Sequence, residues 1–226
     1  MSGGPTIGFV HTVLALPPTF TELAQELIPD AEVFHIADES LLGVTRRTGA
    51  LSAVTQRRVL GHILSAVDAG ADAVVVTCSS VGPAVDAARA FVGAPVYRID
   101  EAMADEAVRT GPRVGVVATL RTTLEPTAAL VTRRAQEAGK QATVVSRVAE
   151  GAFDALQAGD RDRHDELVRA ELRELSREVD VVVLAQASMA RVADTLGAAE
   201  RPVPILSSPR LGMQRVAELV AQLPAA

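Results

Sequence analysis

The chain has 226 residues, 48% of them hydrophobic, and a formal net charge of -6. This length suits one large or two small domains. The modest acidic charge argues against a nucleic-acid-binding protein, and no apolar run reaches the roughly 18–20 residues that a membrane span needs. A single cysteine excludes an internal disulfide framework, and the first residues lack the basic and apolar regions of a signal peptide. We therefore expect a cytoplasmic protein that binds neither nucleic acid nor membranes.

Short apolar runs alternate with longer segments of helical periodicity through the first hundred residues. The polar stretch 45–49 is expected to form a loop. Gly70 is expected to end a helix, and Asp100 to cap the start of the next one. Strands are predicted at residues 7–10, 31–36, 73–77 and 95–99, and helices at 18–27, 51–70 and 83–91.

The same alternation restarts after residue 112. Gly139 is expected to end one helix and Asp160 to cap a long one. Regular alternation of strands and helices is typical of α/β proteins with parallel sheets. Strands are predicted at residues 113–118, 142–148, 181–184 and 203–206, and helices at 124–138, 160–178, 188–196 and 210–223.

The two halves of the chain match each other at a nearly constant shift. Residues 7–12 match 114–119 at a shift of 107, and residues 72–78 match 180–186 at a shift of 108. We infer an internal duplication, with two pseudo-symmetric halves that each contain a four-stranded parallel sheet flanked by helices. The duplication places Cys78 and Gln186 at equivalent strand ends.

Cys78 follows the unbroken apolar run 73–76, which is typical of a strand buried on both faces. A helix is expected shortly after it. Open α/β sheets bind ligands at the carboxyl ends of their strands, and a helix N-terminus there would favour the thiolate form of the cysteine. Cys78 is therefore the leading candidate for a catalytic residue, against the plainer interpretation of a small buried side chain.

These residues resemble the aspartate/glutamate racemase superfamily, which includes hydantoin racemases, maleate isomerases and arylmalonate decarboxylases. The apolar strand and Cys-Ser-Ser of residues 74–80 resemble its first-half motif. Its second-half motif, a strand ending in a Gly-Cys-Thr-like triplet, falls on Ala185, Gln186 and Ala187, so the strand matches and the cysteine does not. The resemblance implies two α/β halves with a ligand cleft between them, residues 1–100 with 208–226 and residues 101–207, and a homodimer.

The resemblance also implies where a substrate carboxylate would bind, through backbone N–H groups and small hydroxyls at the strand ends. The catalytic positions that it implies are Cys78 and Gln186, where Gln186 can hydrogen-bond a carboxylate, carbonyl or enolate but cannot act as a general base. His11, at the end of the first strand, could be a base or donor, or a satisfied structural histidine. The implied substrate-binding residues are His11, Thr12, Ser79, Ser80, Val81, Thr119, Thr122, Thr123, Ala187 and Ser188.

The function that the resemblance implies is cofactor-independent isomerisation, either racemisation or cis-trans isomerisation, next to the carboxylate of a small organic acid. Cys78 would act as acid/base or nucleophile. The alternatives are a decarboxylase or other carbon-carbon lyase on the same scaffold, and a non-catalytic protein that binds small carboxylates. The absence of a second cysteine gives weight to chemistry at one face of the substrate.

Other classes of site find no support in the residues. The four histidines show no metal-ligand spacing, so no metal site is expected. Neither a P-loop nor a Gly-rich dinucleotide motif follows the first strand, so no cofactor is expected. The single lysine, Lys140, is predicted at a helix end away from the strand tips, which argues against Schiff-base chemistry.

Overall fold

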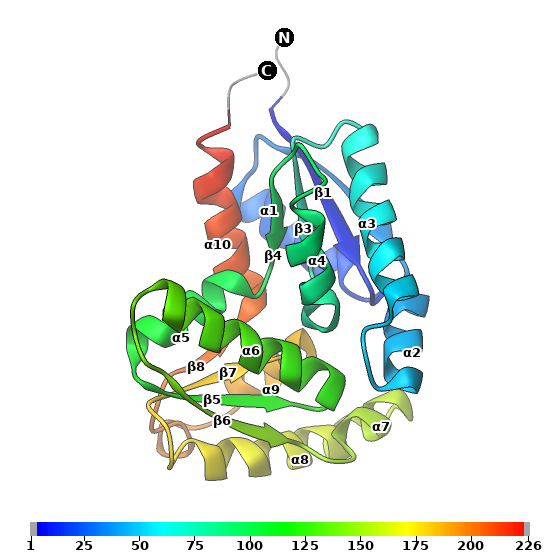
Figure 1. The fold of residues 1–226 in the computed structure, drawn as a ribbon. Helices are drawn as coiled ribbons and strands as arrows, with labels where there is room; N and C mark the ends of the chain where they lie inside the picture. Colours follow the sequence, from blue (N-terminus) through cyan, green and yellow to red (C-terminus); the bar gives the residue numbers. More distant parts are fainter. Residues whose placement is uncertain (1–3, 224–226) are drawn as a thin grey trace. The chain divides into compact units, whose positions relative to one another are not determined.

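A computed structural model describes residues 4–223 and contains two four-stranded parallel sheets with helices on both faces (Figure 1). The strand order is β2-β1-β3-β4 in one sheet and β6-β5-β7-β8 in the other. The α/β class and the pair of parallel four-stranded sheets predicted from the sequence are confirmed.

The chain divides into two compact units, residues 1–99 with 209–226 and residues 100–208. The chain therefore passes between the units twice, once before α5 and once at the start of α10. The first unit comprises β1 (Thr6–His11), α1 (Pro17–Leu27), β2 (Glu32–Ala37), α2 (Glu39–Thr48), α3 (Ala53–Asp68), β3 (Ala73–Val76), the 3-10 turn η1 (Ser79–Val81), α4 (Gly82–Ala88), β4 (Val96–Arg98) and α10 (Ser208–Val220).

The second unit repeats this order of elements, with two helices after its second strand as in the first, and adds a 3-10 turn before its last strand. Its closing 3-10 turns are η2 (Ala187–Met189) and η3 (Ala198–Glu200). The remaining elements are α5 (Glu101–Thr110), β5 (Arg113–Ala118), α6 (Arg121–Glu137), β6 (Thr143–Val148), α7 (Ala152–Gln157), α8 (Arg161–Leu175), β7 (Val181–Leu184), α9 (Ala190–Asp194) and β8 (Ile205–Ser207).

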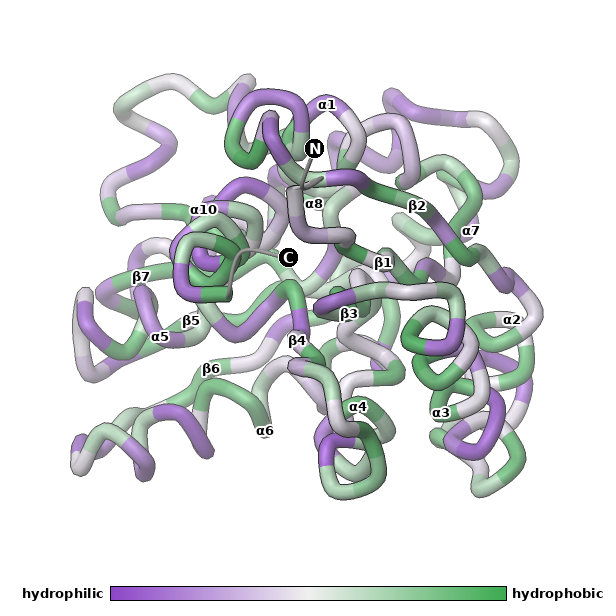
Figure 2. Tube along the Cα trace, turned by 90° about the horizontal axis from the view of Figure 1, so that it is seen from above, coloured by the Kyte–Doolittle hydropathy of each residue, from purple (hydrophilic) through white to green (hydrophobic). Residues whose placement is uncertain are grey.

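Both faces of the first sheet are covered by helices. Alternate residues of β1 and β3 point to opposite sides, so both sets of side chains are buried. Ile7 and Phe9 on β1 pack with Met213 of α10 and with helix α1, whereas Val74 and Val76 on β3 pack with α3 and α4. In Figure 2 hydrophobic positions run along β1 and β3, and α3 alternates hydrophobic with hydrophilic positions along its turns. Each such fully buried aliphatic or aromatic side chain contributes about 1.5–3 kcal/mol.

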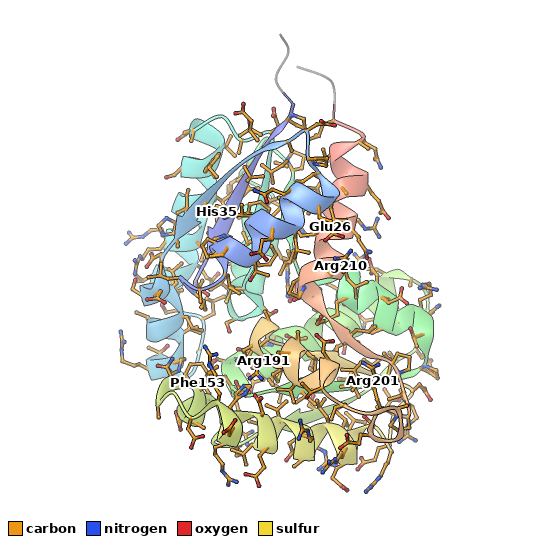
Figure 3. All side chains as sticks on the ribbon, turned by 180° about the vertical axis from the view of Figure 1, so that it is seen from behind. Glu26, His35, Phe153, Arg191, Arg201 and Arg210 are labelled. Atoms are coloured by element: carbon orange, nitrogen blue, oxygen red, sulfur yellow. The ribbon has the colours of Figure 1, made fainter. Side chains whose placement is uncertain are left out.

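Helix α10 is held in the first unit by polar as well as apolar contacts. Arg210 Nη1 donates to Glu26 Oε2 of α1 at 2.9 Å (Figure 3). Gly212 lies so close to the backbone oxygen of Ile99 that a Cβ there would come within 2.4 Å of it. The last helix of the chain therefore packs on residues contributed by the first hundred.

The internal duplication extends to individual hydrogen bonds. Asp72 Oδ2 accepts the backbone N–H of Thr6 at 2.7 Å, and Asp180 Oδ2 accepts that of Arg113 at 2.8 Å. Thr77 N donates to Val10 O at 3.0 Å, and Ala185 N donates to Val117 O at 2.9 Å. These pairs are related by the same shift of 107–108 that relates the two halves of the sequence.

The prediction of a loop at residues 45–49 is wrong, because the helix α2 occupies Glu39–Thr48. Asp38 caps this helix by accepting the N–H of Ser40, and Gly49, with φ +67, ends it in the left-handed conformation. Leu41 and Thr45 are buried one turn apart. Burial of this face, rather than intrinsic propensity, explains why a polar segment is helical.

Smaller differences concern helix ends. Asp160 caps α8 through Arg163 N as expected, whereas Asp100 makes no side-chain capping bond to α5. The helix expected at 83–91 covers Gly82–Ala88, and α7 was not predicted because it is only six residues long. Such ends depend on tertiary packing more than on local sequence.

Two glycines allow a test of this packing. A Cβ on Gly115 of β5 would lie 2.7 Å from Leu175 of α8, whereas a Cβ on Gly61 within α3 would meet nothing within 4 Å. We expect Gly115→Ala to lower the free energy of unfolding by about 1–3 kcal/mol, and Gly61→Ala to raise it by up to about 1 kcal/mol. Urea unfolding followed by circular dichroism measures both. Equal effects of the two substitutions would contradict the close approach of α8 to β5.

Candidate active site

The candidate site is built on the carboxyl ends of β1 and β3, which lie side by side in the first sheet. The parallel register pairs Val10 with Val76, so the residues that follow also meet in pairs. His11 lies beside Thr77 on the face covered by α1 and α10. Cys78 packs with the opposite face, covered by α3 and α4, and contacts Thr12.

Cys78 is partly buried and lies at the start of the turn η1. The hydroxyl of Thr12, the backbone N–H groups of Ser80 and Val81, and the hydroxyl of Ser80 are directed at its sulfur. Apart from this sulfur, the buried Thr12 hydroxyl has no hydrogen-bond partner among the described residues. Four polar groups therefore lie around the sulfur, of which the Val81 N–H donates to the backbone oxygen of Cys78 at 3.3 Å. Groups of this kind stabilise a thiolate when it forms.

The resting state of Cys78 differs from the sequence-based expectation. Burial raises the pKa of the thiol above its ordinary value, and the hydrogen bonds from Thr12, Ser80 and Val81 oppose this only in part. The backbone N–H groups of the turn do favour the thiolate, as expected, but the net shift of the pKa is upward. Desolvation of the sulfur outweighs the surrounding donors, so Cys78 is a thiol at neutral pH.

The turn after Cys78 is supported by Arg98 at the end of β4. The Arg98 guanidinium is buried, donates to Asp86 Oδ2 at 2.8 Å, and lies against Gly82. A Cβ on Gly82 would come within 2.3 Å of it. Glycine at this position therefore lets the arginine pack directly under the turn that presents the Ser80 and Val81 N–H groups.

His11 is fully buried and both its ring nitrogens are occupied. Its Nδ1 lies 2.8 Å from Thr77 Oγ1 and its Nε2 lies 2.8 Å from Nδ1 of His35 on β2. His35 Nε2 in turn lies 2.9 Å from Thr21 Oγ1 on α1, and Figure 3 labels His35 beside this helix. Of the two interpretations of His11, this arrangement favours the structural histidine over a base or donor that reaches a ligand.

Gln186 occupies the position in the second unit that Cys78 occupies in the first. Its Oε1 accepts the backbone N–H of Thr119 at 2.6 Å, and its Nε2 donates to Thr119 Oγ1 at 2.8 Å. Because the backbone N–H can only donate, the amide oxygen must face it. The second N–H of Nε2 has no hydrogen-bond partner among the described residues, so Gln186 can donate a hydrogen bond but cannot exchange a proton as a base.

The remaining predicted residues differ in exposure. Ser79, Ser80 and Val81 are buried in the turn after Cys78, and Thr119 and Thr123 are buried in the second unit. Ala187 is partly buried and Ser188 is exposed. The Thr122 hydroxyl oxygen, at the start of α6, is buried without a hydrogen-bond partner in the described part of the chain, which leaves it available to a ligand.

Residues 4–223 contain no group of three or more His, Cys, Asp or Glu side chains placed to hold a metal ion. In the same part of the chain, no helix combines the length and apolar character required to cross a membrane.

Sequence reasoning missed His35, Thr77, Thr21 and Arg98 as parts of this region. Strand alternation gave a partial signal, because the register pairs Phe9 with His35 on adjacent strands. The contact between His11 and His35 depends on side-chain direction across the strands. Thr21 and Arg98 come from α1 and β4, whose packing on these positions has no local sequence pattern.

Comparison with known proteins gives one family and one fold. The family model described as Asp/Glu/Hydantoin racemase matches residues 10–216, and no curated protein sequence matches the chain. A glutamate racemase of Francisella tularensis solved with D-glutamate is 14% identical, with a TM-score of 0.75 over 98% of this chain and 82% of that one. An allantoin racemase of Klebsiella pneumoniae is 22% identical, with a TM-score of 0.67 over 99% and 91% of the two chains. A glutamate racemase of Bacillus anthracis is 16% identical, with a TM-score of 0.72 over 97% and 83%.

The buried His11 predicts a pH dependence of stability. Desolvation, with a smaller effect of the His35 charge, lowers the pKa of His11 from 6.5 to about 4. Since the unfolded chain binds this proton at higher pH than the folded chain, stability is fully present above about 6.5 and is lost as the pH falls toward 4. The contribution is about 3 kcal/mol by linkage. We expect His11→Gln to flatten the dependence of unfolding free energy on pH in this window; an unchanged slope in urea titrations would contradict it.

Proposed function

Since the chain belongs to the Asp/Glu/Hydantoin racemase family, we propose that it is an isomerase that acts on a small organic acid next to a carboxylate, without a cofactor. In this proposal Cys78 is the reacting side chain. The observation that carries it is the convergence of the Thr12 hydroxyl and the Ser80 and Val81 N–H groups on a single strand-end sulfur.

One thiol can carry two isomerisation reactions with balanced atoms and electrons. As a base, the thiolate removes the proton next to the carboxylate, and the electron pair of the C–H bond passes into an enediolate. The planar enediolate turns over in the site, and the thiol returns the proton to the opposite face of the same carbon, which inverts it. As a nucleophile, the thiolate adds to an alkene, the former double bond rotates, and expulsion of the thiolate restores the alkene.

Gln186 argues against a racemisation in which two side chains exchange protons with the substrate. Inversion at a carbon by two side chains needs a proton acceptor on one face and a donor on the other, and an amide can supply neither. Its free N–H can stabilise a carboxylate or enediolate oxygen by hydrogen bonding. We therefore propose that Gln186 binds substrate and that all proton or sulfur transfer passes through Cys78.

The substrate class follows from the polar groups around the proposed reacting side chain. The Thr122 hydroxyl is buried without a partner in the described residues, and the hydroxyls and backbone N–H groups near Cys78 suit an anion. Glutamate and allantoin, named for the solved relatives, are the first compounds to test. We also propose the family's homodimer and a cytoplasmic location, which light scattering and cell fractionation test.

A decarboxylase is the second candidate, because one observation favours it. Loss of CO₂ leaves an enediolate that needs a proton from one face only, and Cys78 is a neutral thiol able to supply that proton. This requirement fits a site with Gln186 in place of the second cysteine.

The proposal is tested by isotope exchange in D₂O. Glutamate, aspartate, allantoin, maleate and a substituted malonate are incubated with the wild-type protein, and the carbon next to the carboxylate is followed by NMR. We expect label or isomerised product, and a loss of at least about 100-fold with Cys78→Ala, since positioned acid/base groups contribute 100- to 10,000-fold. Thr132→Val, a surface change on α6, is the matched control.

The products separate the candidates. Label with an unchanged carbon count supports a racemase, fumarate formed from maleate without label supports cis-trans isomerisation, and release of CO₂ supports the decarboxylase. Turnover that is equal in the wild type and in Cys78→Ala would overturn the role of the thiol.

The raised pKa of Cys78 predicts that reactivity grows with pH. Because the thiolate is the reactive form, we expect the rate of iodoacetamide alkylation to keep rising beyond about pH 8.5, the ordinary pKa of a free cysteine. Thr12→Val should move the profile to still higher pH, since the Thr12 hydroxyl is one of the groups that lower the pKa of this thiol. A profile that levels off near pH 7 would contradict the desolvated sulfur.

A further inference from the structure

We propose that His11 and His35 are positioning residues, which as a neutral pair with fixed tautomers anchor Thr77 and thereby hold the strand end that carries Cys78. The catalytic meaning of this inference rests on the proposed function, because there Cys78 is the reacting group. The geometry behind it is a chain of hydrogen bonds that runs from α1 through β2 and β1 to the end of β3.

The donors and acceptors of this hydrogen-bond chain can be assigned by starting from Thr21, the residue farthest from Cys78. Thr21 Oγ1 donates to Pro17 O at 2.9 Å, so toward His35 Nε2 it can only accept, and that nitrogen carries a proton. In neutral His35 the other nitrogen, Nδ1, is then an acceptor. It accepts from His11 Nε2 at 2.8 Å, which leaves His11 Nδ1 to accept from the Thr77 hydroxyl at 2.8 Å. Every donor has one acceptor when both rings are neutral and protonated at Nε2.

The surroundings of the pair favour this neutral state. Phe9 stacks on both rings, with centroid distances of 6.0 Å to His11 and 5.2 Å to His35, and Phe20 of α1 lies 5.6 Å from His11. The titratable group that acts on His11, within the described residues, is His35 itself. The other groups packed against the pair from α1 and β3 are the uncharged Thr21 and Thr77. An extra proton on either ring would place two donors face to face or displace the Thr77 hydroxyl.

The internal duplication shows that the parallel strands do not require this chain. The second unit has Ala118 and Ala185 at the positions of His11 and Thr77, at shifts of 107 and 108. In the first unit His35 lies opposite Phe9, and in the second unit Ser146 takes the place of His35, opposite Val116. The same strand ends form there without a histidine pair, and Gln186 stands at the position of the cysteine. The hydrogen-bond chain is thus found in the unit that contains the thiol.

Thr77 links the pair to Cys78 through the backbone. Its N–H donates to Val10 O at 3.0 Å and its hydroxyl is directed at His11. The next residue, Cys78, points to the opposite face, where its sulfur must meet the Thr12 hydroxyl and the turn N–H groups. If the tautomers reverse, Thr77 can donate only to Val10 O at 3.4 Å, and this strand end is held less tightly.

Histidine tautomers can be measured directly by NMR of protein labelled with ¹⁵N-histidine at neutral pH. His11→Gln and His35→Gln variants assign the signals. We expect both rings of the wild type to be neutral and protonated at Nε2. A cationic ring, or one protonated at Nδ1, overturns the proposed direction of the chain.

The coupling to Cys78 is tested with Thr21→Val, which removes the acceptor of His35 without touching the strand ends. We expect both histidines to shift toward protonation at Nδ1. We also expect alkylation of Cys78, the single cysteine, to accelerate about fivefold, the effect of one lost hydrogen bond on an opening equilibrium. Thr21→Ser keeps the hydroxyl and should restore both tautomers and alkylation rate.

Thr132→Val is the matched control, since Thr132 Oγ1 makes the same bond to the helix, donating to Ala128 O at 3.1 Å, but contacts no histidine. Equal alkylation rates in Thr21→Val and Thr132→Val would overturn the positioning role, as would unchanged tautomers in Thr21→Val. Neither measurement uses a substrate, so the result stands or fails separately from the proposed isomerase activity.

Discussion

The parallel register of β1 against β3 is the constraint on which the rest of the site depends. It places Val10 opposite Val76 and so brings the next two residues of each strand together in pairs. Because successive side chains point to opposite faces, one pair, Thr12 and Cys78, places a hydroxyl beside the sulfur. The other pair, His11 and Thr77, closes a neutral hydrogen-bond chain. A one-residue slip would exchange the two faces and destroy both.

The two units use this register for different chemistry. Where the first has a desolvated thiol, the second has an amide whose oxygen satisfies a backbone N–H of its neighbouring strand. The fold is thus symmetric while its polar groups are not. Under the proposed function, this difference leaves Cys78 as the side chain that can exchange a proton, whereas the amide of Gln186 can only form hydrogen bonds.

Much of the architecture could be predicted from sequence, because buried strands such as residues 73–76 and 181–184 are continuous apolar runs, and because the duplication repeats them at one shift. Helix α2 could not, since its helicity depends on burying Leu41 and Thr45. The position of Cys78 at a strand end could be predicted for the same reason as the strands. Its raised pKa and the partners of His11 were not, because desolvation and contacts across strands arise only from packing.

The return of the last helix, α10, to the first unit has a consequence for synthesis on the ribosome. The second unit is a continuous segment, residues 100–208, whereas the first needs α10 to cover Ile7, Phe9 and Val75. During translation the half that is made first is therefore completed last, with one face of its sheet covered only by α1 until Met213 and Val216 emerge. The nascent chain carries an exposed apolar surface through nearly its whole synthesis, which is the condition under which folding chains aggregate or recruit chaperones.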